Sequence, residues 1–86
     1  MASYTIEWKT SAEKELRRLG RSVIPRIVAT VGGLATDPFP AGCRKLKGSE
    51  HTFRIRVGDY RVIYEVLVTR LLVEVMRVRH RKDAYR

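Results

Sequence analysis

The fold of this chain is decided by residues 52–67, which read Thr52-Phe-Arg-Ile-Arg-Val-Gly-Asp-Tyr-Arg-Val-Ile-Tyr-Glu-Val-Leu67. In the first half, apolar side chains alternate with Arg54 and Arg56, the period-two pattern of a strand with one buried face. Gly58-Asp59 is a tight-turn signal of the hairpin kind. The alternation then resumes with Val62, Tyr64 and Val66. The stretch therefore predicts an antiparallel hairpin, with strands over 52–57 and 60–67, whose solvent face carries arginines.

Two further strands are predicted on either side of this hairpin. Residues 71–78 are apolar on both faces at their start, which indicates a central strand, and residues 4–8 alternate like a half-buried one. Between the strand over 4–8 and the hairpin, the spacing of apolar residues predicts two helices. The first begins at a capping box formed by Thr10 and Glu13, and Ser22 caps the second. Their buried stripes are Ala12, Leu16 and Leu19 in the first helix, and Ile24, Ile27, Val28, Val31 and Leu34 in the second.

The segment after the helices breaks regular structure. Residues 37–42 contain two prolines and a glycine, which end the second helix, and residues 44–48 are interpreted as a basic connector. The order of elements is therefore β-α-α-β-β-β. This order predicts an α+β fold, with two N-terminal helices packed on one face of a mainly antiparallel four-stranded sheet. A chain of 86 residues is expected to form a single domain over residues 1–86.

Charge is the strongest compositional signal. Eighteen Lys and Arg face nine Asp and Glu, a formal net charge of +9, and the excess lies mainly after residue 40. Such a chain is typical of proteins that bind a polyanion; a basic surface with no such ligand is the alternative. The basic residues do not fall on one amphipathic helix, and no apolar run approaches the roughly 20 residues that cross a bilayer, so no membrane partner is expected. The single cysteine, Cys43, excludes an internal disulfide and fits a cytoplasmic protein.

Arginines gather on neighbouring strands of the predicted sheet. If the strands pair in sequence order, Arg61, just past the turn, comes within reach of Arg54 and Arg56. Guanidinium groups bind phosphate through two hydrogen bonds and stabilise the extra charge of a pentacoordinate transition state. We therefore predict a phosphodiester site, with solvated surface charge as the alternative for each arginine taken alone. By its spacing, the last strand adds Arg77, Arg79 and Arg81 on one side, with His80 between the last two and Tyr85 shortly beyond.

The acidic residues argue against one class of nuclease. Metal-dependent nucleases need clustered carboxylates, whereas here no acidic pair stands at ligand spacing in the basic region, so neither a metal nor another cofactor is expected. A nuclease without a metal generally uses the 2′-hydroxyl of RNA as nucleophile, with a base, an acid and cations around the phosphate. Histidine is the side chain best suited to exchange protons near neutral pH, so His80 is the candidate for proton transfer; a structural histidine is the alternative. Tyr85 is a candidate for stacking on a base, and His51 is expected to be a loop residue.

Three segments, in this order, resemble the RelE/ParE toxin superfamily, and its RelE side most closely. They are Lys45-Leu-Lys-Gly48, the hairpin from Phe53 to Tyr64, and Val78-Arg-His-Arg-Lys-Asp-Ala-Tyr85. The resemblance implies a RelE-like fold and a type II toxin: an endoribonuclease, or mRNA interferase, that enters the ribosomal A site and cleaves the exposed mRNA codon. It also implies a cognate antitoxin, which should be acidic because this chain is basic. The family's site positions fall on Arg54, Arg56, Arg61, Arg81 and Tyr85, and contacts to RNA or the ribosome are expected of Lys45, Lys47, Arg77, Arg79 and Lys82.

One departure from the family pattern affects the mechanism. Well-known members have lysines where this chain has Arg54 and Arg56, and a lysine there is a proposed general base. Arginine stays protonated in proteins, so Arg56 is expected to stabilise charge, and His80 is left as the candidate base or acid. Two other readings remain open: a ParE-like inhibitor of DNA gyrase without nuclease activity, and a plain nucleic-acid-binding module.

Overall fold

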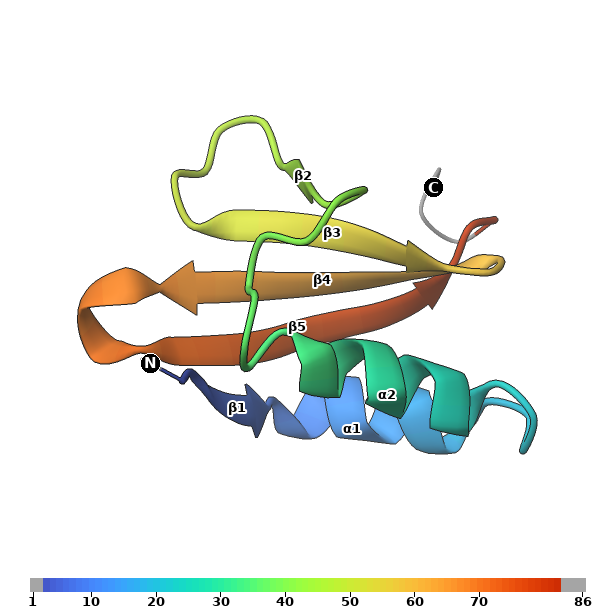
Figure 1. The fold of residues 1–86 in the computed structure, drawn as a ribbon. Coiled ribbons are helices and arrows are strands. Elements are labelled where there is room, and N and C mark those ends of the chain that lie inside the picture. Colours follow the sequence, from blue (N-terminus) through green and yellow to red (C-terminus); the bar gives the residue numbers. More distant parts are fainter. Residues whose placement is uncertain (1–2, 83–86) are drawn as a thin grey trace.

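The computed structural model describes residues 3–82 and contains one sheet and two α-helices. The five strands lie side by side in the order β1-β5-β4-β3-β2, as Figure 1 shows. Only the β1–β5 pair is parallel; the other three pairs are antiparallel. The elements are β1 (Thr5–Trp8), α1 (Thr10–Arg17), α2 (Ile24–Gly33), β2 (Arg44–Lys45), β3 (Thr52–Val57), β4 (Tyr60–Leu67), the 3₁₀ turn η1 (Val68–Arg70) and β5 (Leu72–His80).

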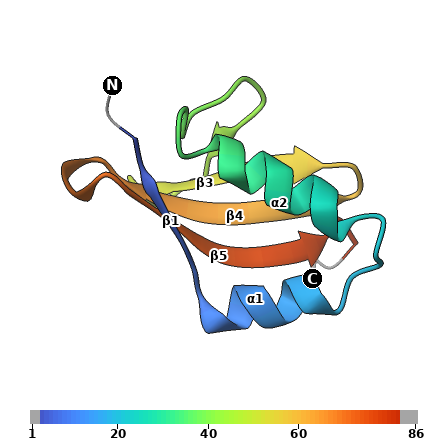
Figure 2. The same cartoon turned by 60° about the horizontal axis from the view of Figure 1, so that its bottom comes forward.

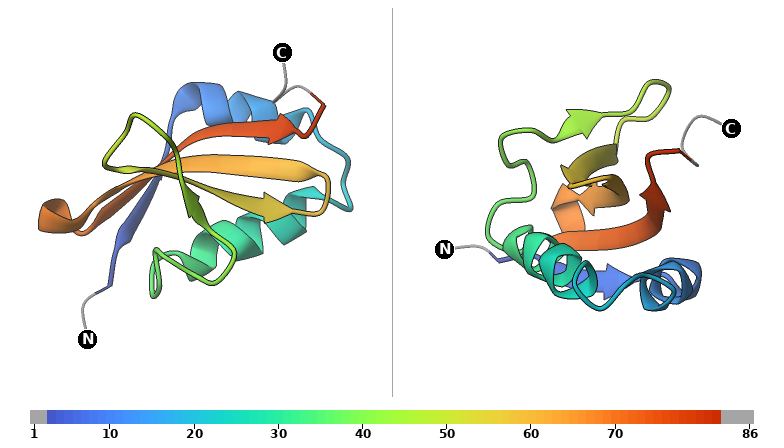
Figure 3. Two further views of the ribbon diagram at one scale, coloured as in Figure 1. Left: turned by 90° about the horizontal axis from the view of Figure 1, so that it is seen from above. Right: turned by 90° about the vertical axis from the view of Figure 1, so that its right-hand side faces the viewer.

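The α+β architecture predicted from the sequence is confirmed, and both strands of the 52–67 hairpin have the predicted bounds. Both helices lie on the same face of the sheet, which the end-on view in Figure 3 and the tilted view in Figure 2 show together. The core lies between the helices and this face, where burial of apolar surface stabilises the fold. Its buried members are Ala12, Leu16, Ile27, Val31, Leu34, Ile55, Val57, Val62, Tyr64, Val66, Val73, Val75 and Val78.

The sheet has five strands rather than the four predicted. The expected basic connector contains β2, in which Arg44 pairs with Arg54 and Lys45 with Phe53. Gly42 and Gly48 lie on either side of it with positive φ angles of 94° and 81°, so the backbone turns sharply before and after it. A strand of two residues is too short to show an alternating pattern, which is why periodicity missed it.

Both predicted helix caps are wrong. Lys9 is the N-cap of α1, with extended backbone and no side-chain cap bond, and Thr10 already belongs to the helix. Glu13 instead forms an ion pair with Arg17, 3.4 Å away. At α2 the N-cap is Val23 rather than Ser22, again without a side-chain bond. Here the turn before the helix uses main-chain groups, because the N–H of Val23 donates to the Gly20 carbonyl (3.0 Å).

The buried stripe of α2 is narrower than predicted. Ile27, Val31 and Leu34 are buried, whereas Ile24 is only partly so and Val28 is 46% exposed. The helix ends at Gly33 and lies over the sheet with a single row of side chains toward the core. Val28 follows the buried Ile27 directly and is also apolar, but it lies outside this row, so its residue type alone does not predict its burial.

A β-bulge in β5 sets the direction of its side chains. Ile63 pairs with Arg77 and Tyr64 pairs with Val75, so Met76 is an extra residue opposite the register shift. Val75 and Val78 can therefore both face the core although they are three residues apart. The strand itself begins at Leu72, one residue later than predicted, because Leu71 has a left-handed backbone with φ of 50°.

Helix α1 contacts the edge of β5 beyond the point where β1 ends and accepts a backbone hydrogen bond there. The last backbone bond on this edge runs from the Lys9 N–H to the Val75 carbonyl (2.9 Å). Farther along, the Val78 N–H donates to Oε1 of Glu15, which projects from α1 (3.0 Å). A carboxylate thus supplies the acceptor that a neighbouring strand would have supplied.

Tyr64 fastens the loop between α2 and β2 to the sheet. Its side chain is fully buried, and its hydroxyl donates to the Pro38 carbonyl (2.9 Å). Burial, with the nearby Cys43 thiol and the Asp37 carboxylate, raises the pKa of Tyr64 well above its ordinary value, so the hydroxyl stays protonated. The loop that leads into β2 is therefore attached to β4 at Pro38 by this hydrogen bond.

Candidate nucleic-acid interface

The face of the sheet opposite the helices carries two rows of arginines that cross the strands. Directly paired residues project to the same side of a sheet. One row runs from Arg56 to Arg61 to Arg79. The second runs from Arg44 to Arg54, Ile63 and Arg77. We call this surface the arginine face.

Three arginines surround one depression at the end of the hairpin, with a volume of about 250 Å³. Arg56 comes from β3 and Arg61 from β4, directly opposite it in register. Arg81 comes from the residues just after β5, and not from the strand itself as the sequence suggested. We call this depression the arginine pocket; Gly58, Asp59 and Tyr60 complete its lining.

The tight turn holds Arg81 in place. The Arg81 N–H donates to the Asp59 carbonyl (2.7 Å), and its guanidinium lies 3.9 Å from the Asp59 carboxylate. Gly58 has a φ of 60°, as a two-residue hairpin turn requires at its first position. The sequence therefore joins the three guanidinium groups through local turn geometry and one long-range backbone bond.

A second depression, of about 330 Å³, lies beside the arginine pocket and shares Arg56 with it. Its lining is Gly42, Arg44, Arg54 and Arg56. Arg44 was not among the predicted site residues, because the family resemblance that drew attention to the basic connector begins at Lys45. The available signal was its position two residues before Leu46 in a basic run, which does not fix the face to which it points.

Arg77 and Arg79 start on the arginine face but are held at its edge by Glu15. Nη1 of Arg77 lies 3.9 Å and Nε of Arg79 lies 3.6 Å from Oε2 of this glutamate. Neither arginine lines the arginine pocket. The predicted single cluster of six arginines is therefore wrong in this respect: two of them are partly neutralised by a carboxylate from α1.

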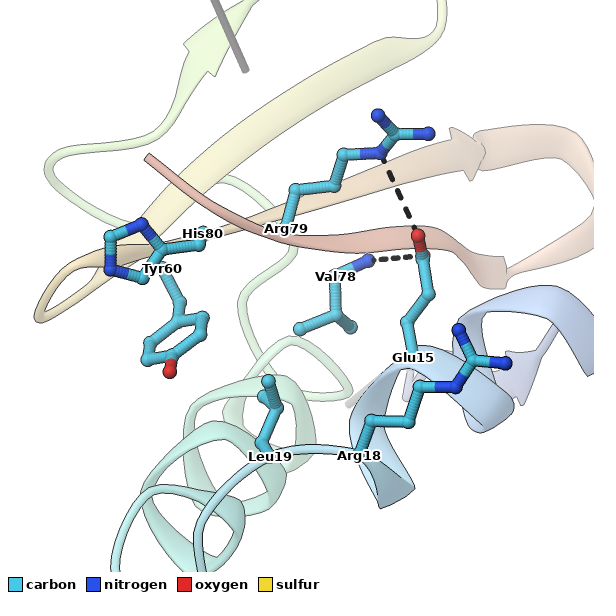
Figure 4. A pocket seen from close by; sticks show the side chains of 7 residues that line it. All are labelled: Glu15, Arg18, Leu19, Tyr60, Val78, Arg79 and His80. Carbon is cyan, nitrogen blue, oxygen red and sulfur yellow. Dashed lines mark hydrogen bonds and ion pairs between the residues drawn. The ribbon is translucent and has the colours of Figure 1, made fainter. Parts of the chain in front are cut away.

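His80 lies on the other side of the sheet from its arginine neighbours, contrary to the expectation that it stands among them. It pairs with Tyr60, and the two rings meet edge-on with centroids 5.2 Å apart. Its Nδ1 accepts a hydrogen bond from the Lys82 N–H (3.2 Å), so the neutral ring carries its proton on Nε2. Figure 4 shows His80 and Tyr60 at one end of a separate cavity of about 500 Å³, with Glu15 at the other.

The remaining predicted residues lie around these sites. Lys45 pairs with Phe53, whose ring packs against the core, so it projects away from the arginine face. Lys47 is exposed in the turn after β2, and Lys82 is exposed after β5. His51 lies in the loop before β3, as expected. Tyr85 lies outside the described residues.

Within residues 3–82, no three His, Cys, Asp or Glu side chains are grouped so that they could hold a metal ion. No helix in the same part of the chain is both long and apolar enough to span a membrane.

Comparison with known proteins gives consistent matches over almost the whole chain. Residues 6–85 match the family model described as ParE toxin of type II toxin–antitoxin system. The toxin RelG of Mycobacterium tuberculosis is 34% identical, with 96% of this chain and 97% of the relative covered. Among solved structures, the archaeal RelE–RelB complex of Pyrococcus horikoshii matches with a TM-score of 0.83 and 26% identity, covering 92% of this chain and 96% of the other. The RelBE2 toxin–antitoxin complex of M. tuberculosis matches with a TM-score of 0.79 and 28% identity, covering 91% and 98%.

Proposed function

This chain belongs to the RelE/ParE superfamily of type II toxins, and from that membership we propose that it is a ribosome-dependent endoribonuclease that cleaves mRNA in the A site. The observation that carries this proposal is the arginine pocket, in which Arg56, Arg61 and Arg81 converge. Three guanidinium groups around one depression suit a phosphodiester and the additional charge of its transition state. Such a protein would act in the cytoplasm, where ribosomes are.

The proposed reaction is an attack by the RNA 2′-hydroxyl on the adjacent phosphorus. The O–P bond that forms gives a 2′,3′-cyclic phosphate, and the bond that breaks releases a 5′-hydroxyl. One proton leaves the 2′-hydroxyl and one is taken up by the departing 5′-oxygen, so no metal-bound water is needed. Because arginines remain protonated, Arg56, Arg61 and Arg81 bind and stabilise charge rather than move protons.

The proton transfers need groups other than these arginines. We propose His80 for this step: it lies outside the arginine pocket, but Tyr60, with which it pairs, lines both the pocket and the cavity that contains His80. If His80 transfers a proton, His80→Gln should change the pH profile of cleavage and not only its rate. We also propose that the ribosome supplies much of the positioning, by holding the mRNA in line for attack, and that Tyr85 contacts the RNA.

A second candidate function is inhibition of DNA gyrase without cleavage. The observation that favours it is the matching family model, whose description is that of ParE toxin. A surface that only binds another protein does not require three guanidinium groups around one depression. The arginine pocket therefore favours the nuclease.

We further propose an acidic antitoxin as the physiological partner. The chain carries a formal charge of +9, and the solved relatives from P. horikoshii and M. tuberculosis are toxin–antitoxin complexes. Complementary charge speeds association and suppresses wrong partners. Co-purification of the neighbouring open reading frame's product, with loss of toxicity, is the expected result; a lone chain that is not toxic would argue against it.

The two functions are separated by parallel assays on the same preparation. We expect the chain, added to an in-vitro translation reaction, to produce mRNA ends that are in phase with codons and absent without ribosomes, while gyrase supercoiling continues. Arg61→Gln and Arg81→Ala should each lower cleavage on the order of 10²-fold or more with the fold intact. The control is Arg70→Gln, which removes an exposed charge in η1. This turn follows the Leu67–Leu72 end of the β4–β5 pair, whereas the pocket lies at the Tyr60–His80 end. Intact mRNA with inhibited gyrase would refute the nuclease.

A further inference from the structure

We infer that Arg44, together with Arg54 and Arg56, forms a second phosphate subsite, which binds the RNA phosphate next to the one in the arginine pocket. The inference rests on the proposed function, because it takes the same ligand chemistry one nucleotide farther along the strand. Its basis is the depression of about 330 Å³ that these arginines and Gly42 line.

The strand register gives the spacing of the two subsites. Arg56 belongs to both depressions, with Arg61 beside it in one and Arg54 and Arg44 beside it in the other. Arg54 and Arg56 are two residues apart on β3, about 7 Å along the strand. This separation is comparable with that of consecutive phosphates in an extended nucleic-acid strand. A single-stranded RNA can therefore place one phosphate in each depression.

The distribution of ion pairs supports the same placement of the RNA strand across the two depressions. Arg77, Arg79 and Arg81 each have a carboxylate within 4 Å. Arg44 and Arg56, by contrast, form no ion pair with any residue of the 3–82 range. The positive charges of Arg44 and Arg56 are therefore not offset by an ion pair, and an anionic strand gains from binding to them.

The backbone holds Arg44 ready for this role. Arg44 pairs with Arg54 in β2, and the Leu46 N–H donates to the Thr52 carbonyl (2.9 Å) on the other side of the short strand. The incoming loop is fixed by the bond from the Tyr64 hydroxyl to the Pro38 carbonyl. A cation on a strand loses less conformational entropy on binding than one on a mobile loop.

Binding to short RNAs that cannot be cleaved tests the subsite without relying on catalysis. We would measure the dissociation constants of fluorescent 2′-O-methyl oligonucleotides with one to four phosphates by anisotropy, from about 50 to 200 mM salt. For the wild type, we expect a gain in affinity with the second phosphate. In Arg44→Gln this gain should disappear, and the slope of log K against log [salt] should become shallower by about 0.7, the loss of one contact on a single strand.

Matched variants make the outcome specific. Arg44→Lys retains the charge and should retain the slope, whereas Arg70→Gln removes an equal charge elsewhere and should behave as wild type; thermal unfolding checks that each variant is folded. If Arg44→Gln matches Arg70→Gln while Arg61→Gln lowers the slope, the second subsite is wrong and the proposed function stands. If the wild type gains nothing from any phosphate, both are wrong.

Discussion

Replacing Glu15 by alanine should destabilise the fold much more than replacing Glu13, although both glutamates lie on α1. The Glu15 carboxylate accepts the Val78 N–H at 3.0 Å, on the stretch of β5 that β1 does not reach. Loss of a hydrogen bond to a charged acceptor, with a part-buried donor left unpaired, costs about 1.5–3 kcal/mol. The ion pairs to Arg77 and Arg79 add about 0.5 kcal/mol or less, since these arginine side chains are 49% and 37% exposed and solvent screens them.

The matched control is Glu13→Ala. It removes only an exposed pair with Arg17, for which about 0.3–0.5 kcal/mol is expected. We therefore expect Glu15→Ala to lose about 2–3 kcal/mol of unfolding free energy, and to melt on the order of 10 °C below Glu13→Ala. Glu15→Gln keeps an oxygen acceptor and should fall between the two.

Urea unfolding followed by circular dichroism measures the free energies, and hydrogen exchange reports the bond itself. The Val78 amide should exchange faster in Glu15→Ala than in Glu13→Ala, with the core amides of β4 shifted only by the change in global stability. If the two alanine variants agree within about 0.5 kcal/mol, then α1 does not seal the edge of β5 through this carboxylate, and that reasoning is refuted.

Four further substitutions test other parts of the fold. Tyr64→Phe should cost about 1 kcal/mol through the lost bond to Pro38. Because the folded state raises the pKa of Tyr64, the unfolded chain releases this proton first, and wild-type stability should fall above about pH 10; unfolding at about pH 11 should show about 1.4 kcal/mol of loss that the Phe variant lacks. In α2, Ile27→Ala should cost about 2–5 kcal/mol and Val28→Ala less than about 0.5, and similar losses in both would contradict the observed burial. Leu71→Ile should cost about 1–2 kcal/mol in urea titrations, since a β-branched residue is strained at φ of 50°; a neutral result would mean that the turn relaxes.

The parts of the fold that could be predicted are those specified by local patterns. Apolar alternation through Ile55 and Val62 gives both strands of the hairpin, and Gly58-Asp59 gives its turn. The strand β2 could not be found because it is formed by pairing with β3 rather than by any pattern of its own. The bulge at Met76 was hidden for a similar reason, since an extra residue in a strand appears only when the partner's register is known.

In the candidate site, too, the residues placed by local structure could be predicted, and those placed by long-range contacts could not. Arg56 and Arg61 come together because they follow from the hairpin register, which two residues of turn determine. Glu15, more than 60 residues before Arg79 in the chain, draws that arginine to the sheet edge, and no local spacing reports such a contact. His80 was placed among arginines because sequence neighbours were treated as spatial neighbours, whereas successive residues of a strand project to opposite faces.

The shortness of β2 also affects how these molecules behave in concentrated solution. Within residues 3–82, β4 pairs with β3 along its whole length on one side. On the other side β2 pairs with it only at Phe53 and Arg54, so the edge from Ile55 to Val57 on that side is an open edge of the sheet. An exposed sheet edge can pair with a strand of another copy and so start aggregation. A second copy that paired at this edge would bring its own guanidinium groups against Arg56. Like charges thus protect the edge. A variant that neutralises Arg56 therefore loses this safeguard, and light scattering should precede any interpretation of its lost activity.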